Sequence, residues 1–153
     1  MSEREEEGEG HGYCFFHSVP VRFSDVDLGG HAHHSQALVY FEEAREAYWR
    51  KVVEGGGEGV GYILAEAQVR YHARILYPQT LEVAVRVSVL GKKHFVMEYE
   101  ARSPDGEPLA SGSTVMVLYD YDAGRTGNVS DEMRRKIQAH EGRSLPRRRG
   151  REA

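Results

Sequence analysis

A short segment of the chain gathers many side chains that could take part in chemistry. Residues 25–36 read DVDLGGHAHHSQ, so two aspartates, two glycines and three histidines stand just before a stretch with a helical pattern. The first backbone N–H groups of a helix lack intrahelical acceptors, and the helix dipole adds partial positive charge there. Such an end binds anions or stabilises an oxyanion that forms during a reaction.

The carboxylate of Asp27 is the candidate catalytic group of this segment. Asp27 stands seven residues before His34, so a turn can bring its side chain next to the helix start. Gly29 and Gly30 let the chain turn sharply and let a ligand approach the backbone. A carboxylate beside an oxyanion site serves acyl transfer, either as a nucleophile or as a general base for water.

The same residue types also allow a metal-dependent hydrolase. Zinc would use two or three of these side chains together with water. The candidate ligands are Asp25, Asp27, His31, His33 and His34. No second cluster with ligand spacing follows, because His72, His94 and His140 stand on separate expected elements. We therefore predict no metal ion, while a polar turn without chemistry is a third interpretation.

Two helices are expected from the spacing of apolar residues. The positions that recur at helical spacing are Ala37, Phe41, Ala44, Tyr48 and Val52. They predict one long helix with a broad apolar face, directly after the polar segment. A short C-terminal helix is expected over residues 131–141, with Ser130 as its N-cap.

Alternating apolar and polar residues predict five strands. Their ranges are 13–23, 63–77, 81–90, 94–102 and 108–121. Short connections between the last four imply an antiparallel meander, and Pro20 places the first strand at an edge or a bulge. The predicted fold is α+β, in which a curved antiparallel sheet of five to six strands wraps around the long central helix. Its exposed edge strands make a homodimer an expectation.

Length and composition indicate one soluble domain. The chain has 153 residues, of which 40% are hydrophobic and 29% are charged. No apolar run is long enough for a membrane span, and the acidic N-terminus does not resemble a signal peptide. We expect a cytoplasmic protein with no membrane partner. Cys14, the single cysteine, excludes an internal disulfide and is expected to be a small buried residue in a strand.

The two ends of the chain lack an apolar face and differ in charge. The first ten residues carry five glutamates and one arginine, whereas the C-terminal segment GRSLPRRRGREA is strongly basic. We predict an acidic disordered tail over residues 1–11, a single domain over 12–141 and a basic disordered tail over 142–153. No nucleic-acid partner is expected, because the folded part shows no basic patch with interleaved aromatic residues.

The segment VRFSDVDLGGHAHHSQALVYFEEAR strongly resembles the aspartate motif of hotdog-fold acyl-CoA thioesterases of the 4-hydroxybenzoyl-CoA thioesterase type. The resemblance covers about residues 17–121, since the expected strand order and the segment AEAQVRYHARILYPQTLEVAVRV are also similar to that family. In the family the second aspartate of the D-x-D motif is catalytic, which implies Asp27 here. Backbone amides at the helix start polarise the thioester carbonyl, which implies His34 and Ser35.

The resemblance also implies which residues meet the substrate. Gly30 is expected to contact the substrate on its own grounds, because a glycine in the turn would let a ligand approach the backbone. Ala37 stands where the family often carries a tyrosine, so it should leave space for a longer or bulkier acyl group. Basic residues after the second of the four consecutive strands commonly meet coenzyme A phosphates in the family, which implies Lys92 and Lys93.

The predicted function is hydrolysis of an acyl-CoA thioester to a free carboxylic acid and coenzyme A. The predicted assembly is a homodimer, two copies of which form a dimer of dimers. No cofactor is expected, because coenzyme A is part of the substrate and preset donors stabilise the oxyanion. A hotdog domain that binds acyl-CoA without hydrolysing it is the alternative. A metal-dependent hydrolase that uses His31, His33 and His34 is a further one.

Overall fold

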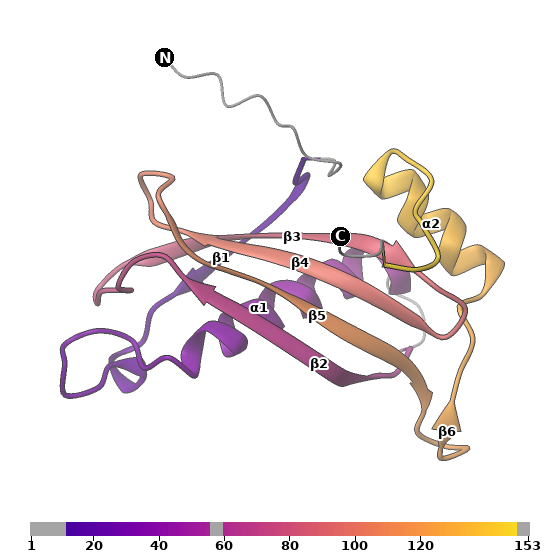
Figure 1. Ribbon diagram of the computed structural model, residues 1–153, viewed down its shortest axis with the longest axis horizontal. Helices are drawn as coiled ribbons and strands as arrows, with labels where there is room; N and C mark the ends of the chain where they lie inside the picture. Colours follow the sequence, from indigo (N-terminus) through magenta and orange to yellow (C-terminus); the bar gives the residue numbers. More distant parts are fainter. Residues whose placement is uncertain (1–11, 56–59, 150–153) are drawn as a thin grey trace.

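A computed structural model of the protein describes residues 12–55 and 60–149. An antiparallel sheet curls around one long helix, α1 (Gln36–Tyr48), and a shorter helix, α2 (Asp131–Glu141), lies beside one end of the sheet (Figure 1). This arrangement confirms the predicted α+β architecture, with a central helix wrapped by a curved sheet.

The sheet has six strands and two edges. The strands are β1 (Phe15–Pro20), β2 (Tyr62–Tyr71), β3 (Thr80–Leu90), β4 (His94–Arg102), β5 (Pro108–Asp120) and β6 (Arg125–Thr126). Two short helical segments flank α1, namely η1 (Phe23–Asp25) and η2 (Trp49–Glu54). The order in space is β1, β3, β4, β5, β2, with β6 attached to β5. Pro20 therefore lies on an edge strand, as predicted.

The predicted meander is correct for three strands and wrong for the fourth. β3, β4 and β5 pair antiparallel with their neighbours in the chain. β2 does not pair with β3, but crosses to the opposite edge and pairs antiparallel with β5. Alternation along a strand reports which faces are apolar but not which strand it pairs with, and residues 72–79 are enough to carry the chain across.

Strand β2 is also shorter and more exposed than predicted. It ends at Tyr71 instead of continuing to residue 77, because the N–H groups of His72 and Ala73 both donate to the carbonyl of Leu109, at 2.9 and 3.2 Å. A bulge near Ala65 shifts its register against β5. Most residues of this edge strand are exposed on both faces, although their alternation is typical of a strand with one apolar face.

The core between α1 and the sheet is aromatic. Phe41 stacks on Tyr99 with ring centroids 4.7 Å apart, and Trp49 stacks on Phe95 at the same distance. Such pairs contribute about 0.5–1.5 kcal/mol beyond their area burial. Phe41 approaches the sheet closely where β5 carries Gly112, because a Cβ there would lie 2.9 Å from Cε2 of Phe41.

Helix α2 begins and ends as the sequence predicts. The Ser130 hydroxyl accepts a hydrogen bond from the N–H of Met133 at 3.1 Å, which confirms Ser130 as the N-cap. Gly142 ends the helix with a φ of 73°, in the left-handed region that glycine tolerates. None of the helices in the described part of the chain is long and apolar enough to cross a membrane.

The packed part of the chain continues beyond residue 141, where the predicted domain ended. Leu145 is buried, and the N–H of Leu90 donates to the carbonyl of Pro146 at 2.9 Å. The first residues of the predicted basic tail are therefore packed against β3, because the side chain of Leu145 is buried in the core although its neighbours in sequence are polar. The predicted acidic tail 1–11 and residues 150–153 lie outside the described residues.

We expect Gly112→Ala to destabilise the fold by about 1–3 kcal/mol, the usual cost of an overpacked core. The added Cβ would meet Phe41 and would lie 2.3 Å from the backbone oxygen of Gln68, which cannot move without disturbing β2. The matched control is Gly127→Ala, whose Cβ would contact Leu118 at an ordinary 3.7 Å. Urea unfolding of both variants checks this, and equal midpoints would contradict it.

Candidate active site

The polar segment before α1 folds into a narrow turn. Val26 and Ala32 form an isolated antiparallel bridge, and the N–H of Asp27 donates to the carbonyl of His31 at 3.1 Å. The N–H of Gly30 donates back to the carbonyl of Asp27 at 3.1 Å. Gly30 has a φ of 81°, a conformation that other residues rarely adopt, so glycine is required there for the turn itself.

Asp25, the first aspartate of the D-x-D motif, has a structural role. Its side chain is only 5% exposed and accepts hydrogen bonds from the Tyr40 hydroxyl at 2.8 Å and the N–H of Arg22 at 2.9 Å. The Arg22 guanidinium lies 3.7 Å away. The backbone carbonyl of Asp25 accepts a hydrogen bond from the N–H of His33 at 2.9 Å. Asp25 therefore holds the turn against α1.

The environment of Asp25 also acts on Tyr40. Burial raises the pKa of Tyr40 well above its ordinary value, and the hydrogen bond to the Asp25 carboxylate raises it further. The Tyr40 hydroxyl therefore stays protonated and remains a donor to Asp25 over the whole physiological range.

Asp27, the second aspartate, is exposed at the mouth of a pocket. Its Oδ1 accepts a hydrogen bond from the N–H of Gly29 at 2.8 Å, which orients the carboxylate within the turn. A Cβ at Gly29 would lie 3.1 Å from that oxygen and 3.1 Å from Nε2 of His31. Gly29 thus lets the carboxylate and the imidazole approach the same point of the backbone.

The two amides predicted as oxyanion donors differ in their hydrogen bonds. The N–H of Ser35 donates to Nδ1 of His33 at 3.2 Å, and the N–H of Gln36 donates to the carbonyl of His33 at 2.9 Å. The His34 amide makes no such bond within the described residues. Ser35 is the N-cap of α1 without a side-chain cap bond, so the helix start keeps a donor for a ligand at His34.

A pocket of about 380 Å³ joins these residues to the end of β2. From the polar segment and α1 it is lined by Asp27, His31, Ala32, His33, His34 and Ala37, and from the end of β2 and beyond by Tyr71, His72, Ala73, Arg74 and Ile75. The fold therefore brings the predicted Asp27, His34 and Ala37 to one cavity. A larger hollow of about 540 Å³ around Glu98 and Ser113 contains none of these groups.

The end of β2 contributes pocket residues that no motif in the sequence indicated. The hydroxyl of Tyr71 donates to the carbonyl of His34, and partial burial raises the pKa of Tyr71, which keeps this donor protonated. His72 contacts the Ser111 hydroxyl through Nε2 at 2.8 Å. Arg74 brings a cation to the pocket wall. These residues alternate like any strand, so only the crossing of β2 over the helix start reveals them.

Lys92 and Lys93 lie away from this pocket in the same chain. They form the connection between β3 and β4, at the end of the sheet opposite to the start of α1 (Figure 1). The carbonyl of Lys92 accepts from the N–H of Val129 at 2.7 Å, and Nζ of Lys93 lies 3.4 Å from the Thr126 hydroxyl. One chain alone does not bring them to the pocket, so their predicted role requires a second chain.

The histidines of the polar segment do not converge on one point. Over the described ranges, one group of three or more potential ligands has its atoms within 4.8 Å of one another, and it is Cys14, His140 and Glu141. Asp27, His31, His33 and His34 form no such group, although the rings of His33 and His34 lie 3.9 Å apart.

We expect Tyr40→Phe to destabilise the protein by about 1–3 kcal/mol, because Asp25 then loses a buried hydrogen bond. Above pH of about 10 the parent should also lose stability, since the folded state keeps a Tyr40 proton that the unfolded chain releases. Above that pH, the free energy of unfolding should fall less steeply with pH in the variant than in the parent. Urea unfolding against pH measures both effects.

The control is Tyr121→Phe, which removes an exposed hydroxyl that donates to the Tyr62 carbonyl at 3.1 Å. It should change the free energy of unfolding by less than about 0.5 kcal/mol. A Tyr40→Phe variant as stable as this control would mean that Asp25 does not depend on the buried hydrogen bond.

A family of known proteins matches most of this chain. The family described as the thioesterase-like superfamily matches residues 21–137, which include the polar segment, α1 and all of β2 to β5. The uncharacterized protein YsmA of Bacillus subtilis (strain 168) is 29% identical over 121 residues, covering 78% of this chain and 82% of YsmA.

Solved structures share the fold. A thioesterase from Thermus thermophilus in complex with coenzyme A and Zn is 32% identical, with a TM-score of 0.75 over 88% of this chain and 99% of its own. A thioesterase superfamily protein from Jannaschia sp. CCS1 is 25% identical, with a TM-score of 0.76 over 87% and 86%. The predicted hotdog fold is confirmed, and the chain belongs to the thioesterase-like superfamily.

Proposed function

We propose that the protein hydrolyses an acyl-CoA thioester to a free carboxylic acid and coenzyme A, in the manner of the 4-hydroxybenzoyl-CoA thioesterase type. The observation that carries this proposal is the pocket in which Asp27 and the start of α1 face one cavity. The Thermus thermophilus neighbour, which binds coenzyme A, supports this substrate class.

The proposed reaction begins with the thioester carbonyl at the helix start. Its oxygen accepts from the His34 amide, where the dipole of α1 favours negative charge. The Asp27 carboxylate either attacks the carbonyl carbon or takes a proton from an attacking water. The tetrahedral oxyanion then collapses and the C–S bond breaks. The coenzyme A thiolate takes its proton from the protonated Asp27 in the base route, or from solvent in the nucleophilic route. In the nucleophilic route, water hydrolyses the acyl–aspartate anhydride in a second step.

The hydrogen bonds around the helix start suit this role. The N–H of Gln36 donates to the carbonyl of His33, which polarises the peptide unit that carries the His34 amide, and Tyr71 donates to the carbonyl of His34 and holds the helix start in place. His33 takes up the Ser35 amide, so His34 is the principal proposed donor and Ser35 a supporting one. Preset donors of this kind lower the barrier without metal or redox chemistry.

The size of the pocket suits the acyl part of the substrate. Its volume of about 380 Å³ is in the range of small-ligand sites, so most of the coenzyme A portion would lie outside it. Ala37 is buried in the wall and contributes one methyl group, which leaves room for a bulky or long acyl group. Gly30 keeps the turn open beside it, and Arg74 supplies a cation near the mouth.

A homodimer would complete the site. Edge strand β2 exposes Ile63, Leu64 and Tyr71 at 39%, 50% and 49%, a liability that pairing with a second β2 removes. In an antiparallel pair of β2 edges, the partner's connection between β3 and β4 approaches this chain's pocket. Lys92 and Lys93 of the partner subunit would then meet coenzyme A phosphates. In the same proposal, two such dimers join through their outer sheet faces into a tetramer.

We expect Asp27→Asn to lower kcat by at least about a hundredfold, because it removes the nucleophile or base. Release of free thiol from aromatic, short-chain and long-chain acyl-CoA thioesters measures this, with and without a chelator. Asp105→Asn in the exposed turn after β4 is the matched control and should keep full activity.

Binding of acyl-CoA without turnover by the parent would favour a non-catalytic binding domain. Loss of turnover with chelator alone would favour a metal-dependent hydrolase.

We expect Leu64→Glu to dissociate the dimer, because two like charges would meet at the paired β2 edges. Leu64 is half exposed in the single chain, so the substitution should leave the fold intact. Light scattering after size-exclusion chromatography gives the mass, and circular dichroism checks the fold. Leu28→Glu, at a fully exposed position outside the sheet, is the control. A parent that is monomeric at micromolar concentration would rule out the β2 dimer.

A further inference from the structure

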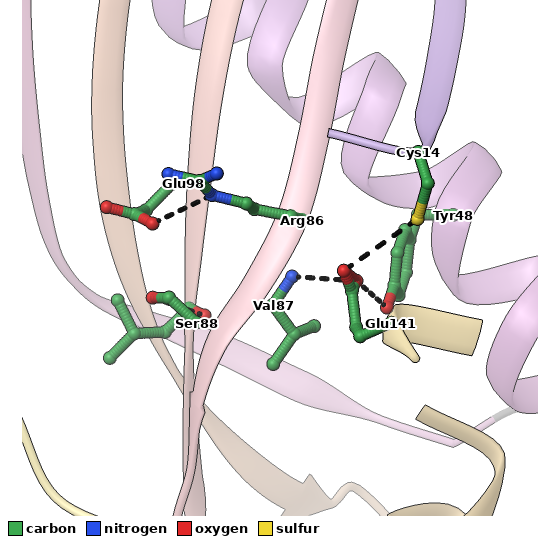
Figure 2. Close-up of polar contacts among 8 residues, drawn as sticks. Cys14, Tyr48, Arg86, Val87, Ser88, Glu98 and Glu141 are labelled. Carbon is green, nitrogen blue, oxygen red and sulfur yellow. Dashed lines mark hydrogen bonds and ion pairs between the residues drawn. The ribbon is translucent and has the colours of Figure 1, made fainter. Parts of the chain in front are cut away.

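Cys14 lies beside the end of α2, far from it in sequence. The structure corrects the prediction of a buried strand residue, since Cys14 is exposed and precedes β1. His140 and Glu141 form the last turn of α2, and Figure 2 shows the Cys14 sulfur and the Glu141 carboxylate pointing toward each other. His140 stands alone in the sequence pattern, because nothing local links residues 14 and 140.

The three side chains lie close to the spacing of zinc ligands. The Cys14 Sγ lies 3.6 Å from Nε2 of His140 and 4.0 Å from Oε1 of Glu141, and all three ligand atoms lie within 4.8 Å of one another. Zinc bonds of about 2.3 Å to sulfur and about 2.0–2.1 Å to nitrogen or oxygen, at tetrahedral angles, place sulfur about 3.6 Å from each of the other two ligand atoms and place nitrogen and oxygen about 3.3 Å apart. Small side-chain movements would bring all three onto one ion.

Neighbouring groups already orient the carboxylate. Oε2 of Glu141 accepts from the Tyr48 hydroxyl at 2.7 Å and from the N–H of Val87 at 3.2 Å, which leaves Oε1 directed to Cys14 (Figure 2). Glu141 is buried, so this orientation is held by the core. Hydrogen bonds of this kind to a ligand carboxylate orient metal ligands in proteins.

The imidazole is held by aromatic packing. The His140 ring stands edge-on to Tyr48 with centroids 5.2 Å apart, and edge-on to Phe15 at 6.0 Å. Tyr48 therefore supports two of the three side chains, through its hydroxyl and its ring. None of these residues lines the pocket that contains Asp27.

We propose that Cys14, His140 and Glu141 bind a zinc ion, with water as the fourth ligand, and that this ion ties the end of α2 to the segment that enters β1. Thiolate and imidazole select zinc over magnesium or calcium, which prefer oxygen ligands throughout. One thiolate and one carboxylate balance the charge of Zn²⁺. Because Cys14 is exposed, solvent can supply the fourth ligand.

Zinc titration of the full chain tests the proposal. The metal-free, reduced protein should bind one Zn²⁺ per chain in competition with a chromophoric chelator, and its Tm should rise with zinc. Co²⁺ in place of zinc should give a thiolate charge-transfer band in the near ultraviolet. Cys14→Ser should abolish that band and weaken zinc binding at least about tenfold, and Glu141→Gln should weaken it similarly.

Two controls keep the result specific. Cys14→Ser alters an exposed side chain, so its Tm without zinc should equal that of the parent. The double variant His31→Gln/His33→Gln removes imidazoles of the pocket and should keep the parent's zinc affinity and cobalt spectrum. The proposal is overturned if the parent binds no stoichiometric zinc, or if this double variant loses zinc while Cys14→Ser retains it.

Discussion

The buried carboxylate of Asp25 is the constraint on which the site depends. A carboxylate with 5% exposure is tolerated only where hydrogen bonds replace water, and the Tyr40 hydroxyl and the Arg22 amide provide them. These bonds lock the turn that carries Asp27 onto the first turns of α1. Because the turn is held in place, Asp27 and His34 line one cavity, although both residues are exposed. The motif therefore separates its two aspartates: Asp25 supports the turn, and Asp27 lies in the pocket, where we propose that it acts.

The pocket exists because two distant parts of the chain meet at the edge of the sheet. The polar segment supplies the carboxylate and the helix start, and the end of β2 supplies Tyr71, whose hydroxyl binds the His34 carbonyl. This meeting follows from β2 taking the outer position beside β5 instead of the position beside β3. The same placement leaves β2 unpaired on one side. The geometry that builds half of the pocket thus also creates the surface that a second chain would cover.

Local sequence patterns were sufficient for most elements because their signals involve near neighbours. The ranges of β3, β4 and β5, the helix that contains Phe41, and the N-cap at Ser130 follow from alternation, helical spacing and capping chemistry. The failures share a cause in tertiary contacts. Strand β2 stops at Tyr71 because of a carbonyl on β5, and Leu145 packs because a core is near. Neither contact can be predicted from the neighbouring residues in the sequence.

By itself, the sequence determined that a turn rich in aspartate, glycine and histidine precedes a long helix, and it predicted that Asp27 lies near the start of that helix. The spacing of seven residues from Asp27 to His34 is a local feature of the chain. So is the glycine at position 30, where the turn requires a positive φ. Only the tertiary structure decided that Tyr71 completes the helix start, that Lys92 belongs to the far end of the sheet, and that Cys14 meets Glu141. Those contacts join residues tens of positions apart, and they depend on strand order and helix docking, which periodicity does not encode.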